Sequence, residues 1–194
     1  MNNCTISDNS ASYFGGGVRL DGGNAALKNC LITRNISTNS RAGGVLLGGG
    51  CAVNNCTVVS NWAKTAGGGI YFGSSAGSGT ANNCIVWGNI GSPSSNNDIG
   101  VNSGFIADIN YSCVNSTQFI GLGQGNIYAN PLFVDTNTAN YRLAANSPCI
   151  NTGTNESWMT GAFDLDGRTR IRYGIVDIGA YETIYDGTIY RMGF

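Results

Sequence analysis

The sequence predicts an all-β protein, a parallel β-helix of about four to five coils followed by an irregular C-terminal cap. Three observations support this fold class: a repeat of about 26 residues, alternating apolar residues within each repeat, and Gly or Asn between the expected strands. Repeats of this length are typical of solenoids, in which each unit buries its apolar face against its neighbours.

The clearest repeated segment contains a cysteine. Its four copies span residues 2–9, 28–35, 54–61 and 82–89. In each copy the cysteine and the residue two positions later are apolar, and alternate residues of a strand point to the same side. We therefore expect four stacked strands whose interior faces carry Cys4 and Ile6, Cys30 and Ile32, Cys56 and Val58, and Cys84 and Val86.

A second repeated segment begins with two or three glycines. Its copies span residues 15–20, 43–47 and 67–72. A helical solenoid is the rival interpretation, but consecutive glycines are unfavourable in a helix and no stretch has helical apolar spacing. A third, weaker segment leads into each cysteine. Each period should therefore hold two or three short strands.

Two columns of stacked side chains follow from this register. The first is a ladder of amides at one corner, formed by Asn9, Asn35, Asn61 and Asn89. The second is the cysteine column, whose side chains should stay about 4.8 Å apart, farther than the roughly 3.8 Å that a disulfide prefers. We expect these four cysteines to be free thiols. The places of Cys51, Cys113 and Cys149 stay open, and an odd total of seven leaves at least one thiol unpaired.

The chain divides into coils at 1–115 and a C-terminal cap at 116–194 that packs on the solenoid. Residues 111–115 read as a fifth, degenerate coil, and all three prolines follow residue 91. A bare terminal strand exposes unpaired backbone groups, so the last unit of a solenoid is usually atypical.

Five segments of the C-terminal part carry a resemblance to a known family. They are Pro-Leu-Phe-Val-Asp at 131–135, Tyr-Arg-Leu at 141–143, Ser-Pro-Cys-Ile-Asn-Thr-Gly at 147–153, Asp-Leu-Asp-Gly-Arg-Thr-Arg at 164–170 and Val-Asp-Ile-Gly-Ala-Tyr-Glu at 176–182. In this order they resemble the choice-of-anchor Q region of bacterial surface proteins. The coils resemble the right-handed parallel β-helix of the pectate-lyase-like superfamily. The resemblance implies an extracellular or cell-surface protein.

The two ends of the chain depart from that family. No signal peptide opens it, no anchor follows Glu182, and no apolar run is long enough to span a membrane. We therefore expect a piece of a longer protein. The abrupt start within a cysteine segment also predicts a homo-oligomer that forms through an uncapped N-terminal coil.

Composition excludes several function classes. The chain has no histidine, which removes Ser-His-Asp triads and His-ligated metals. Ten basic residues against eleven acidic ones give no basic surface for nucleic acid. We expect a noncatalytic secreted or cell-surface module that either contacts polysaccharide or serves as a scaffold or adhesin.

The candidate carbohydrate-binding residues are Arg19, Tyr71 and Trp87. They should point outward from the glycine-led and cysteine strands, where an aromatic ring can stack on a sugar and an arginine can bind an acidic one. The alternative is that both aromatic rings pack under the C-terminal part or against a loop.

The alternative function is that of a polysaccharide lyase or glycosidase, which the resemblance implies would use clustered carboxylates, calcium and a Lys or Arg base. Asp8 and Arg34 are the catalytic candidates because they occupy matching places in neighbouring coils, where a solvated ion pair is the other interpretation. Asp164, Asp166 and Asp177 are candidates for a structural Ca²⁺ site, although a hydrogen-bonded turn explains the first two equally well. No other cofactor is expected.

Overall fold

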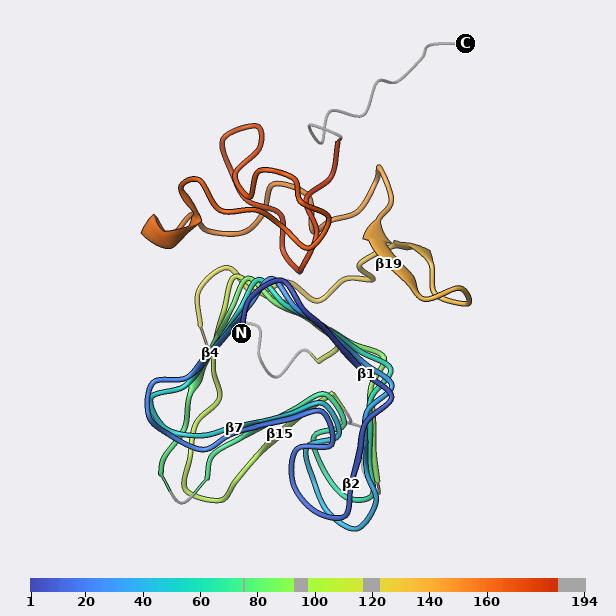
Figure 1. Ribbon diagram of the computed structural model, residues 1–194, viewed down its shortest axis with the longest axis vertical. Coiled ribbons are helices and arrows are strands. Elements are labelled where there is room, and N and C mark those ends of the chain that lie inside the picture. Colours follow the sequence, from blue (N-terminus) through green and yellow to red (C-terminus); the bar gives the residue numbers. More distant parts are fainter. Residues whose placement is uncertain (75, 93–97, 117–122, 185–194) are drawn as a thin grey trace.

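The computed structural model describes residues 1–74, 76–92, 98–116 and 123–184. It is a parallel β-solenoid of about four turns, as the repeat predicted (Figure 1). Strands from successive coils pair in parallel and in register, so four ladders run along the solenoid. None of the described residues forms a helix long and apolar enough to cross a membrane.

The first sheet takes one strand from each cysteine segment and a last one from the degenerate coil: β1 (Thr5–Ser7), β5 (Leu31–Thr33), β9 (Thr57–Val59), β13 (Ile85–Trp87) and β17 (Cys113–Val114). The second sheet is built from two-residue strands: β2 (Ser10–Ala11), β6 (Ile36–Ser37), β10 (Trp62–Ala63) and β14 (Ile90–Gly91).

The third sheet contains the glycine-led strands: β3 (Val18–Leu20), β7 (Val45–Leu47), β11 (Ile70–Phe72) and β15 (Ile99–Val101). The fourth sheet leads into the cysteine segments: β4 (Ala26–Lys28), β8 (Ala52–Asn54), β12 (Thr80–Asn82) and β16 (Asp108–Asn110). A coil therefore has four strands, and the expectation of two or three was wrong. The two-residue strands of the second sheet are too short to show any alternation.

The interior of the coils is a single apolar cluster. Cys30, Cys56 and Cys84 are fully buried in it, and Cys4 packs against it partly exposed. All seven cysteines are free thiols in this structure, which confirms the prediction for the column. Each column cysteine acts as a small apolar side chain that fills the space between the sheets.

The asparagine ladder is present and continuous. Asn9 Nδ2 donates to Asn35 Oδ1 at 2.9 Å, Asn35 Nδ2 to Asn61 Oδ1 at 3.0 Å, and Asn61 Nδ2 to Asn89 Oδ1 at 2.9 Å. Asn89 Nδ2 then donates to a carboxylate, Asp98 Oδ1, at 2.6 Å. Because these amides satisfy buried backbone groups as well, the ladder fixes the corner between the first and second sheets.

Glycine is required where the chain turns from the second sheet to the third. A Cβ on Gly43 would lie 2.4 Å from the carbonyl oxygen of Trp62 and 2.5 Å from that of Gly68. The repeated glycines therefore let neighbouring backbones approach more closely than any side chain allows.

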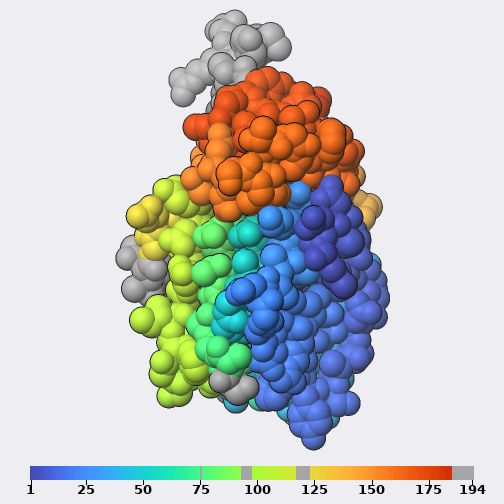
Figure 2. Space-filling view, turned by 60° about the vertical axis from the view of Figure 1, so that its left-hand side comes forward, coloured from blue at the N-terminus to red at the C-terminus, as the bar shows by residue number. Residues whose placement is uncertain are grey.

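The C-terminal region, described over residues 123–184, lies along one side of the coils (Figures 1 and 2). It contains the antiparallel strands β18 (Phe133–Asp135) and β19 (Asn140–Leu143) and a 3₁₀ turn, η2 (Ser157–Met159). Near its start, Ile127 forms a parallel bridge with Cys113 and so extends the first sheet beyond β17.

A second column of asparagines attaches this region to the coils. These residues precede the cysteines and adopt positive φ: Asn3, Asn29, Asn55 and Asn83. Asn29 Nδ2 donates to the carbonyl oxygen of Phe163 at 2.9 Å, and Asn83 Nδ2 to that of Thr154 at 3.0 Å. The first sheet contributes as well, because the Ala180 amide donates to Thr57 Oγ1 at 3.0 Å.

Candidate functional site

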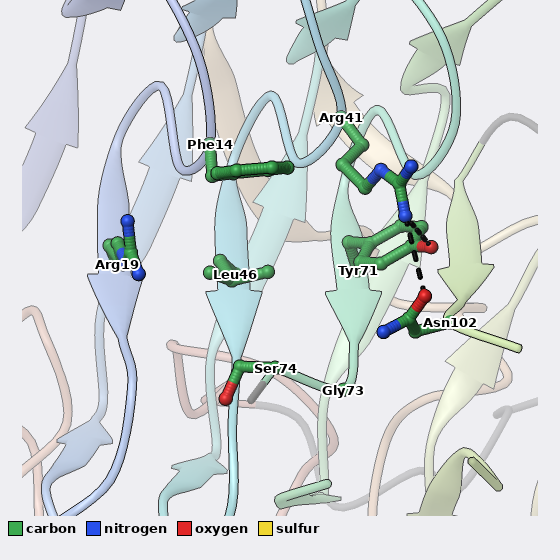
Figure 3. A pocket seen from close by; sticks show the side chains of 8 residues that line it. All are labelled: Phe14, Arg19, Arg41, Leu46, Tyr71, Gly73, Ser74 and Asn102. Atoms are coloured by element: carbon green, nitrogen blue, oxygen red, sulfur yellow. Dashed lines mark hydrogen bonds between the residues drawn. The ribbon is translucent and has the colours of Figure 1, made fainter. Parts of the chain in front are cut away.

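A pocket of about 240 Å³ lies on the outward face of the third sheet (Figure 3). Its described lining comes from three kinds of segment: the outward positions of the strands, the residues before the glycine-led strands, and the residues after them. These residues are Phe14, Arg19, Arg41, Leu46, Tyr71, Gly73, Ser74 and Asn102.

The base of the pocket is one column of paired strand residues. Arg19 on β3 pairs with Leu46 on β7, which pairs with Tyr71 on β11. Their neighbours Val18, Val45 and Ile70 point into the core, so alternation along each strand turns this column outward. The sequence predicted the outward direction of Arg19 and Tyr71, and the structure brings these two residues to one pocket.

Arg41 organises the pocket, and the sequence analysis missed it. Its Nη1 donates to Tyr71 Oη at 2.5 Å and to Asn102 Oδ1 at 3.5 Å. The guanidinium carbon lies 4.8 Å from the centre of the Tyr71 ring and 5.9 Å from that of Phe14. A cation placed between two aromatic rings is held by their negative faces as well as by hydrogen bonds.

This packing changes the expected role of Tyr71. Its side chain points out of the coil, but Arg41 and a small apolar cluster with Leu46 leave the residue only 5% exposed. The exposed aromatic ring at this site is Phe14, which is 38% exposed. The sequence contained a signal for both missed residues, since Phe14 and Arg41 stand one and two positions before the first glycine of their glycine-led segments.

Arg19 is held at the other side of the pocket. Its Nε donates to Asp21 Oδ2 at 3.1 Å, and its guanidinium lies 5.9 Å from the Phe14 ring centre. Hydrogen bonds from the Ser74 hydroxyl and, to a smaller extent, from Arg19 keep the pKa of the Asp21 carboxyl below its usual value. With two arginines and one neighbouring carboxylate, the pocket offers a surplus of positive charge.

The described lining provides several binding groups. They are two guanidinium groups, the Phe14 ring and the hydrogen-bonding side chains of Tyr71, Ser74 and Asn102. The pocket can therefore recognise a ligand by ring stacking and N–H donation.

Asp8 and Arg34 form a bidentate ion pair outside this pocket. Arg34 Nε and Nη2 lie 2.7 Å from Asp8 Oδ1 and Oδ2, and the two side chains are 46% and 59% exposed. Hydrogen bonding to Arg34 lowers the pKa of Asp8. This is the geometry of a solvated ion pair, which the sequence offered as the alternative to a catalytic role. Catalysis by Asp8 and Arg34 remains a prediction.

Trp87 lies on another face of the molecule from Arg19 and Tyr71. It belongs to β13 in the first sheet and packs against apolar clusters shared with the C-terminal region. Its ring centre is 6.2 Å from that of Tyr128. Trp87 therefore packs under the C-terminal region, which was the alternative to an outward-facing carbohydrate-binding ring.

The three candidate metal-binding aspartates are each held by N–H donors. Asp164 Oδ1 accepts from the amides of Asp166 and Arg168 at 2.9 and 2.7 Å, as in a hydrogen-bonded turn. Asp166 is paired with Arg142 through Nε at 2.7 Å. Asp177 Oδ1 accepts from the Asn151 amide at 2.8 Å. In the described parts of the chain no three Asp, Glu or Cys side chains gather as a metal site, so structural Ca²⁺ remains a prediction.

A buried ion pair that the sequence analysis missed lies beside these aspartates. Arg170 Nη2 is 3.0 Å from Glu182 Oε1, and both side chains are inaccessible to solvent. Burial raises the pKa of the Glu182 carboxyl, although the positive charge of Arg170 opposes the shift. Arg170 is the last residue of the segment 164–170, and Glu182 is the last residue of the segment 176–182. Both segments carry the family resemblance, but the sequence did not show that these two residues pair.

No family model, no curated protein and no solved structure matches the chain. The fold and the pocket together define the class: a parallel β-solenoid protein with a cationic, aromatic pocket on one outer face.

Proposed function

We propose that the protein is a noncatalytic secreted or cell-surface module that binds polysaccharide through the pocket of Arg19, Arg41 and Phe14. The resemblance of residues 130–182 to the choice-of-anchor Q region supports the location. The pocket itself supports the binding activity.

The observation that carries the proposal is the orientation of Arg41. Among the residues that the structure describes, Arg41 donates hydrogen bonds from Nη1, to Tyr71 and Asn102. The N–H groups of Nε and Nη2 are therefore left to bind a ligand, on a guanidinium that is already fixed in place. A fixed arginine loses little conformational freedom on binding, so its hydrogen bonds contribute more to affinity.

A saccharide fits the remaining chemistry of the site. Its hydroxyl oxygens, or a carboxylate on an acidic sugar, accept hydrogen bonds from Arg41 and Arg19. The exposed ring of Phe14 offers an apolar surface between the two arginines on which a sugar ring can pack. Small-molecule sites commonly combine aromatic walls with a few polar groups that fix orientation.

The experiment is size-exclusion chromatography with light scattering of the protein mixed with a neutral glucan or with polygalacturonate, with and without calcium. We expect co-elution with polymer mass unchanged. A fall in polymer mass would instead establish the alternative, a lyase or glycosidase. Absence of co-elution with every polymer would refute the binding proposal and leave a scaffold.

A matched pair of variants locates the interaction. Arg41→Gln removes the oriented cation, and we expect at least a tenfold loss of affinity because a charged hydrogen-bonding group is lost. Arg34→Gln makes the same change of charge at an exposed site outside the pocket and should leave affinity unchanged. Equal losses in both variants would show that only net charge matters.

A further inference from the structure

Two cysteines from distant segments meet beneath the C-terminal region. Cys113 lies on β17, where pairing with Ile85 places its side chain on the outward side of the first sheet. Cys149 belongs to the segment 147–153. Both are completely buried and belong to one apolar cluster with Ile85, Leu143, Ile150 and Ile178.

The surrounding contacts hold the two thiols in place. Cys113 Sγ donates to the carbonyl oxygen of Ala129 at 3.1 Å, and the carbonyl oxygen of Cys149 accepts from the Ile178 amide at 2.9 Å. The pKa of the Cys149 thiol is raised, first by its hydrogen bond with the Cys113 thiol and then by burial. Both side chains therefore lie in one small buried cluster at the junction between the coils and the C-terminal region.

This arrangement differs from that of the interior cysteine column. Column cysteines project in the same direction from strands stacked about 4.8 Å apart, so their Cβ atoms stay too far apart for a disulfide. Cys113 and Cys149 approach from opposite sides of the junction. Strand spacing therefore places no lower limit on the distance between their Cβ atoms.

We propose that Cys113 and Cys149 form a disulfide bond when the protein folds in an oxidising environment. Each thiol loses one proton and an S–S bond forms, while two electrons reduce an oxidant of the disulfide class, such as glutathione disulfide, to two thiols. Because both sulfurs are buried in the folded protein, exchange with the oxidant takes place during folding. The bond then ties β17 to the C-terminal region. The proposal is independent of polysaccharide binding.

The test is to unfold and reduce the full chain and to refold it either with a glutathione redox buffer or with a phosphine reductant. The oxidised sample should be lighter by about 2 Da, and peptide mapping should link residue 113 to residue 149. Its Tm should exceed that of the reduced sample by about 5–10 °C, because the bond restricts the unfolded chain. Seven alkylatable thiols after oxidative refolding, or a link between other cysteines, would overturn the proposal.

Serine variants give the matched controls. Cys113→Ser and Cys149→Ser should each abolish both the mass difference and the redox dependence of Tm. Cys51→Ser removes a buried thiol elsewhere in the coils and should retain both. If a variant does not fold, the peptide map of the unmodified chain still decides the question.

Discussion

The guanidinium of Arg170 lies 3.0 Å from the carboxylate of Glu182 within the C-terminal region, where neither side chain reaches solvent. Arg170 Nη2 also donates to the carbonyl oxygens of Asp177 and Gly179, at 2.7 and 2.8 Å. The amide of Ala180, which follows Gly179 in the chain, donates a hydrogen bond to the Thr57 hydroxyl on β9. Arg170 therefore shapes the loop through which the C-terminal region contacts the coils.

Replacing Arg170 should be strongly destabilising. We expect Arg170→Met to lower the free energy of unfolding by about 3–5 kcal/mol, because it leaves the buried Glu182 carboxylate without its opposite charge and takes a donor from two buried carbonyl groups. Glu182→Gln should cost less, since it keeps an oxygen that can accept from the Asp177 amide. Urea denaturation of both variants measures the difference, and equal losses would contradict this account.

The asparagine ladder should respond unequally to loss of its members. Asn61→Ala deprives Asn35 of the acceptor for two N–H groups and removes a hydrogen bond to the Ile32 carbonyl, all in the buried part of the corner. We expect a loss of about 2–4 kcal/mol. Asn9→Ala, at the exposed end, should cost less than about 1 kcal/mol. Chemical denaturation of the two variants under the same conditions makes the comparison, and similar losses would argue against a cooperative ladder.

Asp98 should make stability depend on pH. Burial raises the pKa of its carboxyl from 3.8 to about 6, so the folded protein retains a proton that the unfolded chain loses. This contribution to stability is complete below pH 3.8 and is lost as the pH rises through 6. Asp98→Asn removes it, so between pH 4 and 7 the variant should gain about 1–3 kcal/mol relative to wild type. Parallel stability profiles for the two proteins over this range would exclude the effect.

Gly43 and Gly88 offer a contrast between lack of space and unusual dihedral angle. Gly43→Ala would place a Cβ against two backbone carbonyls, and we expect a loss of more than about 2 kcal/mol. Gly88 has φ 68° but open space around it, in a column where Asp8, Arg34 and Ser60 share that conformation. Gly88→Asn should therefore cost less than about 1 kcal/mol. Thermal denaturation of both variants would contradict this if their Tm values fell equally.

Most of the fold was predictable because the coils repeat. The spacing of Cys30, Cys56 and Cys84 determines both the strand register and the inward face, so the core and the amide ladder follow from alignment alone. The second sheet was not predictable, since a strand such as Trp62–Ala63 is too short to show a period.

The pocket was predictable only in part. Alternation along the strands indicates that Arg19 and Tyr71 point outward, but it cannot show what covers them. Arg41 reaches Tyr71 from the segment before β7, and Asn102 reaches Arg41 from the end of β15 in another coil. The packing of Trp87 was equally unpredictable, because the segment that packs on its ring lies beyond the repeats.

The amide ladder has a polarity, and Asp98 brings it to an end. From Asn9 to Asn89, the side-chain nitrogen of each asparagine donates to the side-chain oxygen of the asparagine in the following coil. All of these hydrogen bonds therefore run in the same direction. An ionised carboxylate has no proton to pass on. A further coil that presented another acceptor oxygen at this corner would meet lone pairs in place of a donor. One aspartate at the end of a row of asparagines thus reverses what the next coil must supply at this corner: a donor, as the side chain of Asn115 provides, in place of an acceptor.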